Sequence, residues 1–298
     1  MRSVETLRNT IGDSFHFLHA KRRDALWRVV EALVLGGRLW LTALGRDMPR
    51  SAKEKHKIKA VDRLLGCRAV QAAVGQMYTA VARWLLRGMT QPVVLVDWTG
   101  CGPNRYLLSA GVPFGGRAIL LHARVVHETQ VATRKVHEEF LDTLAQVIPA
   151  HCRPIIVTDS GFYFHWFERV TRLNWDLVGR LRGRLTVQLD QRKQCIRELF
   201  GMASKRPNDL GVCTVGCNWG GRLRLVLASK PKFKGRTRLT RKGKRRLRSE
   251  DFKHSESARE PWLLATTLGC AAHTVIGTHA TRMQLEESFR DLKSYRFG

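Results

Sequence analysis

Two aspartates in this sequence follow short apolar runs. Asp97 comes directly after Val93–Val96, and Asp159 comes after Ile155–Val157 with one threonine between. We expect each aspartate at the carboxyl end of a buried strand, where α/β sheets open into ligand crevices. An aspartate in such a place is also typical of a turn or a helix cap, so each one alone indicates little.

A glutamate on a predicted helix over residues 282–293 could complete a set of three acids. At about 100° per residue, Arg282, Glu286 and Lys293 fall in one narrow sector of this helix. The sector flanks an apolar stripe formed by Leu285, Phe289 and Leu292. A carboxylate there can reach a metal ion while the two cations contact phosphate. The helix by itself would instead be interpreted as a surface helix with ordinary ion pairs.

Oxygen ligands from three acids suit phosphodiester chemistry. Mg²⁺ prefers such hard ligands, and a pair of ions a few ångströms apart can activate the attacking oxygen and stabilise the leaving one. We predict a pair of Mg²⁺ ions, for which Mn²⁺ can substitute. Asp97 would bridge the two ions, and Asp159 and Glu286 would each complete one site.

The charge of the chain favours a polyanionic partner. Its 298 residues include 52 Lys and Arg against 25 Asp and Glu, a formal net charge of +27, and nucleic acid is the first candidate. Ribosome-associated and membrane-surface proteins share this composition. No segment resembles a secretory signal or a membrane span, so we expect a soluble, cytoplasmic protein associated with the nucleoid. The cysteines are scattered and odd in number, which indicates a reducing compartment, and their spacing does not favour zinc.

The first part of the chain has apolar residues at helical spacing, which predicts a helical domain over residues 1–90. Within it, residues 39–45 and 57–65 could form a helix-turn-helix. Lys57 and Lys59 would then line a phosphate backbone. An ordinary solvated helix face explains the pattern equally well.

After Pro92 the apolar period becomes that of strands. Apolar runs within residues 93–126 predict a strand-rich sheet, and alternating helices and strands follow up to residue 181, which predicts an α/β fold with mixed strand directions. Residues 183–267 show short strands and polar turns. They include residues 230–248, a run rich in Lys and Arg without any acid, which predicts a flexible or DNA-ordered arm or a solvated basic loop.

Three segments together resemble the cut-and-paste DDE transposases of bacterial insertion sequences. They are residues 93–99, 155–162 and 282–293. The relevant branch carries a Tyr-x2-Arg-x3-Glu-x6-Lys signature. Its Arg, Glu and Lys fall here on Arg282, Glu286 and Lys293, and His279 stands in the place of the Tyr. The resemblance extends over essentially the whole chain, including residues 260–266.

The resemblance implies a ribonuclease H-like catalytic fold, in which a mixed sheet is flanked by helices. It also implies an N-terminal all-α DNA-binding domain and a β-rich insertion domain. In this chain the implied domains are residues 1–90 for DNA binding, 91–182 for the first part of the catalytic core, 183–269 for the insertion with its basic arm, and 270–298 for the final helix of the core.

The implied partners are double-stranded DNA, as terminal inverted repeats and as target, and a second copy of the chain in a synaptic homodimer. The implied reaction is cleavage to a free 3′-OH, hairpin formation and opening, and strand transfer. Besides Arg282 and Lys293, the residues implied to contact DNA are His279, Trp262, Arg290, Lys57 and Lys59. His279 could donate to phosphate with a shorter reach than Tyr. Trp262 would receive a flipped base, although a core tryptophan in a strand fits its position as well.

The length of the chain departs from the family pattern. Family members continue beyond the position of Gly298 with a helical region that supports dimerisation, so we expect a carboxy-terminally truncated transposase. A non-catalytic DNA-binding fragment that occupies transposon ends or inhibits full-length transposase is the alternative. A ribonuclease H-like nuclease without joining activity is a third hypothesis.

Overall fold

The computed structural model describes residues 2–215, 220–229 and 260–294. It divides into two compact units: the first contains Met1–Val131, Glu139–Arg153 and Met283–Gly298, and the second contains Ala132–Glu138 and Pro154–Arg282. The predicted basic arm at residues 230–248 lies outside the described residues. No helix of the described part is long and apolar enough to cross a membrane.

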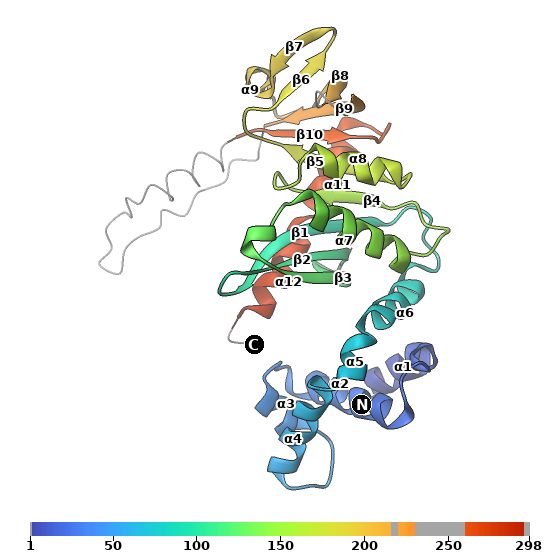
Figure 1. Cartoon of the computed structure of the whole chain (residues 1–298). Coiled ribbons are helices and arrows are strands. Elements are labelled where there is room, and N and C mark those ends of the chain that lie inside the picture. Colours follow the sequence, from blue (N-terminus) through green and yellow to red (C-terminus); the bar gives the residue numbers. More distant parts are fainter. Residues whose placement is uncertain (1, 216–219, 230–259, 295–298) are drawn as a thin grey trace, which may run out of the picture. The chain divides into compact units, whose positions relative to one another are not determined.

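The first unit begins with a series of helices (Figure 1). They are α1 (Arg2–Ile11), the 3-10 helix η1 (Gly12–Phe15), α2 (Ala20–Gly36), α3 (Leu41–Asp47), α4 (Glu54–Leu65), α5 (Arg68–Ala72) and α6 (Val74–Leu86). One apolar cluster gathers around Phe15 and Trp27, and a second gathers around Ala32, Leu44 and Val61. Helix α2 contributes to both clusters and therefore links the other helices into one packed body.

Three antiparallel strands follow in the first unit, in the order β3-β2-β1. They are β1 (Val93–Gly102), β2 (Arg105–Phe114) and β3 (Arg117–His127), followed by the short η2 (Glu128–Gln130) and by α7 (Arg134–Val147), within which the boundary between the units falls. Helix α12 (Met283–Leu292) contacts all three strands (Figure 1). Its Ser288 Oγ accepts a hydrogen bond from the backbone N of Ala118 at 2.8 Å, which fixes the helix on β3.

The second unit is built on a mixed sheet. Its described elements are β4 (Ile155–Thr158), α8 (Phe164–Arg172), β5 (Asp176–Leu181), β6 (Thr186–Leu189), β7 (Arg192–Cys195), α9 (Ile196–Leu199), η3 (Phe200–Met202), β8 (Asn208–Val215), β9 (Gly221–Ala228), β10 (Trp262–Thr266) and α11 (Ala272–Ala280). The strand order is β4-β5-β10-β9-β8-β6-β7, and β4 and β5 are parallel whereas the other pairs are antiparallel. The prediction of an α/β protein with mixed strand directions is confirmed.

Two helices cover the central strands of the second unit. Helix α8 contacts β5, and a Cβ on Gly179 of β5 would lie 2.4 Å from Phe167 Cε1, so the glycine makes room for the helix. Helix α11 contacts β4, β5, β9 and β10. The carboxyl end of β4, which precedes Asp159, and helix α11 therefore both lie against β5.

Candidate active site

Asp97 lies in the middle of β1 rather than at its end, so this part of our prediction is wrong. The fully buried segment does stop at Val96, but the strand continues to Gly102 because its later residues pair with β2. Asp97 itself is half-buried, and its Oδ1 accepts a hydrogen bond from the backbone N of Trp98 at 2.8 Å. The carboxylate is therefore held where the strand passes from buried to more exposed surroundings.

Glu286 lies on α12, in the same unit as Asp97. The apolar stripe beside it is buried at Leu285 and Phe289, which are 0% and 6% exposed, whereas Leu292 is 45% exposed. The predicted stripe is therefore one turn shorter than expected. Glu286 is half-buried at the flank of this stripe, as the pattern indicated.

Lys293 links the Glu286 side of α12 to β1. Lys293 directly follows the last residue of α12, about two helical turns after Glu286 and on the same side. The Lys293 Nζ donates a hydrogen bond to Thr99 Oγ1, and Thr99 projects from the same face of β1 as Asp97, since side chains alternate along a strand. This contact turns the Glu286 side of α12 toward the face of β1 that carries Asp97.

Asp159 follows directly after β4, as expected, and belongs to the second unit. Its Oδ1 lies 3.6 Å from Arg180 Nη1, and its Oδ2 lies 3.8 Å from Arg282 Nη2. The two arginine side chains are only 7% and 11% exposed, and that of Asp159 is 29% exposed. One carboxylate thus lies between two buried guanidinium groups.

The two arginines determine the charge of Asp159. Burial alone would raise the pKa of this carboxyl, but the positive charges of Arg282 and Arg180 outweigh burial and hold its pKa below the ordinary value. Asp159 is therefore ionised at neutral pH. Among the described residues, its Oδ1 has no hydrogen-bond partner, and neither do Nε and Nη2 of Arg180. Buried polar atoms without partners are uncommon and typical of sites that bind a ligand.

His279 lies in the last turn of α11 and is 2% exposed. Burial, followed by the charge of Arg282, lowers its pKa to about 3, so the ring is neutral at pH 7. The ring of half-buried Trp262 meets it edge to face, with centroids 5.0 Å apart. In this arrangement His279 is not presented to solvent, and its contact with phosphate stays a prediction, as does the contact of Trp262 with a flipped base.

The predicted metal ligands are divided between the units, because Asp97 and Glu286 belong to the first and Asp159 to the second. Within the described ranges, no three His, Cys, Asp or Glu side chains are grouped so as to hold a metal ion. The donors nevertheless fit the chemistry of Mg²⁺, which takes carboxylate oxygens. Asp159 fits in particular because it is ionised and keeps a buried oxygen without a hydrogen bond.

The predicted helix-turn-helix segments form α3 and α4, which pack closely. A Cβ on Gly45 would lie 2.6 Å from Ile58 Cα, so this approach requires glycine. On α4, Lys59 is exposed and Lys57 is half-buried. The helix pair needed for the hypothesis is present, and a role in DNA binding stays a prediction.

One residue of the site, Arg180, was missed at the sequence level. It stands in β5, all of whose residues are buried, and a cation within such a strand is a signal that could have indicated a buried partner. Arg290, by contrast, was predicted to contact DNA. It is exposed, and its Nη1 pairs with Glu287 Oε2 at 2.7 Å.

Comparisons with known proteins give one family. The model of the family described as "Transposase DDE domain" matches residues 89–298, the part that holds all three acids. No curated protein matches the chain. Among solved structures, the chain is similar to one described as "Cryo-EM structure of piggyBac transposase synaptic complex with hairpin DNA", with 10% identity and a TM-score of 0.47. The similarity covers 94% of this chain and 60% of that one, so this chain spans about 60% of the length of that protein.

Proposed function

Because the chain belongs to the transposase DDE domain family, we propose that it is a DNA transposase that cuts DNA at transposon ends and joins the cut strand to target DNA. The proposed catalytic acids are Asp97, Asp159 and Glu286. The observation that carries the proposal, beside the family match, is Asp159 held ionised between two buried arginines directly after β4. A ribonuclease H-like core and membership of the branch with the Arg, Glu and Lys signature are parts of the same proposal.

The proposed reaction proceeds by displacements at phosphorus. Water attacks one strand at the transposon end, a P–O bond breaks, and a 3′-OH is left. The oxygen of that hydroxyl then attacks the opposite strand, so that a new P–O bond closes a hairpin and the flanking DNA leaves with its own 3′-OH. Hydrolysis opens the hairpin, and the freed 3′-OH attacks target DNA in the same way. A pair of Mg²⁺ ions, when bound, supplies charge stabilisation for the attacking and leaving oxygens.

The side chains of this chain have separate roles in that scheme. Asp97, Asp159 and Glu286 would hold the metal ions through their carboxylate oxygens. Arg180 and Arg282 neutralise Asp159 in the free protein, and the unpaired donors of Arg180 are suited to a phosphate oxygen of the DNA. Lys293, held by Thr99 on β1, adds a positive charge beside the Glu286 side of α12.

Double-stranded DNA is the proposed partner, as terminal inverted repeats and as target. Helix α4, with Lys57 and Lys59, would contact the phosphate backbone as the second helix of a helix-turn-helix. Trp262 would stack on a base that has left the duplex, and Arg282, Arg290 and His279 would lie near the cut. Synapsis by two copies of the chain belongs to this proposal.

The decisive experiment incubates the full chain with a linear duplex that carries the element's own end, in Mg²⁺. Products are resolved as nicked, hairpin and joined species, and binding is measured separately in Ca²⁺. We expect the Asp97→Asn and Glu286→Gln variants to bind the end as the unmodified chain does but to lose cleavage. Glu287→Gln is the matched control, since Glu287 is the next residue of the same helix and pairs with Arg290.

The outcomes separate the hypotheses. Cleavage at the normal rate by Asp97→Asn or Glu286→Gln would remove that residue from the active site. End binding by the unmodified chain without any cleavage would favour the non-catalytic DNA-binding fragment. Cleavage without joining of a pre-cut end would favour a nuclease.

A further inference from the structure

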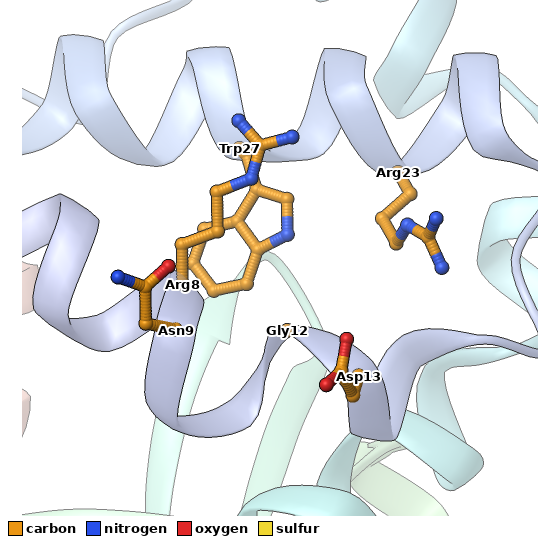
Figure 2. A pocket seen from close by; sticks show the side chains of 6 residues that line it. All are labelled: Arg8, Asn9, Gly12, Asp13, Arg23 and Trp27. Atoms are coloured by element: carbon orange, nitrogen blue, oxygen red, sulfur yellow. The ribbon is translucent and has the colours of Figure 1, made fainter.

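A polar cleft lies among the first helices of the first unit, far along the sequence from the three acids. Its volume is about 420 Å³, and it is lined by Arg8, Asn9, Gly12, Asp13, Arg23 and Trp27. Figure 2 shows the Arg23 side chain extending from α2 toward the turn that carries Asp13, while Arg8 extends from α1 across the Trp27 ring. Two helices and the turn between them thus supply all the walls of the cleft.

Several hydrogen-bond donors of the cleft have no acceptor, or only one, among the described residues. Arg23 makes no ion pair within the described part of the chain, although the Asp13 carboxylate lines the same cleft. Arg8 uses one nitrogen on Asp24, at 3.0 Å, and a guanidinium group has five N–H donors. The indole N–H of Trp27, a residue only 6% exposed, has no hydrogen-bond partner among the described residues. Of these donors, the Trp27 N–H is buried, Arg23 is half-buried and Arg8 is exposed, and a buried donor without a partner is typical of a site that binds a ligand.

Gly12 keeps the cleft open at its floor. A Cβ at this position would lie 3.5 Å from Arg8 Cγ and 4.0 Å from Trp27 Nε1, which are ordinary contact distances. An alanine would therefore fit without a clash, but its methyl group would occupy the space directly beside the Trp27 N–H. The absence of a side chain here leaves room for an atom that could accept from that donor.

We propose that this cleft binds one phosphate group of the DNA backbone, chiefly through Arg23 and Arg8. A phosphate protrudes from the duplex and offers only acceptors, which suits a concave site with several donors, whereas base edges lie inside the grooves. Asp13 faces the same cleft, so its negative charge opposes the phosphate and sets an upper limit on affinity. The proposal rests on the proposed function in so far as DNA is the partner, and it adds a contact site away from α4.

The test measures binding of the full chain to the end duplex by fluorescence anisotropy over a series of salt concentrations. Arg23→Ala should weaken binding about tenfold, as expected for a charge-assisted contact, and should lower the slope of log K against log salt by about one unit. Arg28→Ala is the matched control, because Arg28 is an exposed arginine of the same helix that does not line the cleft. Asp13→Asn should tighten binding, and Gly12→Ala should weaken it without changing the charge.

Three results would overturn the proposal: Arg23→Ala behaves as Arg28→Ala does, Asp13→Asn weakens binding, or Gly12→Ala has no effect. A thermal melt of each variant identifies any loss of folding. The expected result for Asp13→Asn is tighter binding, which loss of folding would not produce, so this variant can be interpreted without the melt. If the unmodified chain cuts the duplex but the variants give any of these three results, the proposed phosphate site is wrong and the transposase proposal stands. If the unmodified chain neither binds nor cuts the duplex, both are wrong.

Discussion

The charge cluster around Asp159 makes the Asp159→Asn variant a test of the structure as well as of catalysis. The change to asparagine removes a negative charge that lies within 4 Å of both Arg180 and Arg282. Two buried guanidinium groups would then lose the negative charge that they share, so we expect the second unit to be destabilised.

The size of this effect follows from the distances. At 3.6 Å and 3.8 Å, with an effective dielectric constant near 20, each attraction is about 4 to 5 kcal/mol before desolvation is subtracted. Removal of one partner from a buried ion pair costs about 3 to 5 kcal/mol. Because the Asp159 side chain is 29% exposed, the lower end of that range applies, so we expect a loss of about 3 kcal/mol.

Hydrogen exchange in peptides that cover β4, β5 and β10 measures this loss locally, and exchange there should become about a hundredfold faster. Asp209→Asn is the matched control, since Asp209 pairs with Arg224 at only 2.7 Å but its side chain is 47% exposed, and exposed pairs contribute about 1 kcal/mol or less. Adding Arg180→Met to Asp159→Asn should recover part of the loss. Unchanged exchange in Asp159→Asn would refute the reasoning, because it would mean that the cluster contributes no net stability.

Two further predictions concern pH and helix packing. Stability should fall as the pH drops below about 6.5. Burial lowers the pKa of three histidines in the folded chain, to about 4 for His122 and to about 3 for His137 and His279. These side chains therefore stay neutral in the folded chain but take up protons when the chain unfolds below about pH 6.5. A urea midpoint that is flat between pH 7 and pH 5 would contradict this. Gly45→Ala should lower the free energy of unfolding by about 1 to 3 kcal/mol and weaken end binding, because its methyl group would clash with Ile58. Gly75→Ala is the control and should be tolerated, because nothing lies within 4 Å of a Cβ at that position. Equal melting temperatures of the two variants would contradict the close packing of α3 against α4.

The sequence was most informative where apolar periodicity is strong. The run Ile155–Val157 predicted β4 and the place of Asp159 after it, because a short, wholly apolar segment can only be a buried strand or part of a buried helix. The same signal failed at Asp97. The apolar run ends at Val96, but β1 continues because its later residues pair with β2. The spacing of apolar residues does not indicate such backbone hydrogen bonding.

Two features of the site could not be predicted for one physical reason, which is that apolar periodicity indicates buried apolar faces but not buried polar or charged side chains. Arg180 lies in β5, all of whose residues are buried, and Asp159, which is distant in the sequence, lies beside it in space and compensates its charge. His279 is predicted to contact phosphate; its ring is buried beside Trp262 and has a lowered pKa, and apolar spacing indicated neither property. Each of these positions is decided by a partner that is distant in the chain or on another element. A sequence can therefore suggest which charged residues take part in a site, while the pairs they form follow from the fold.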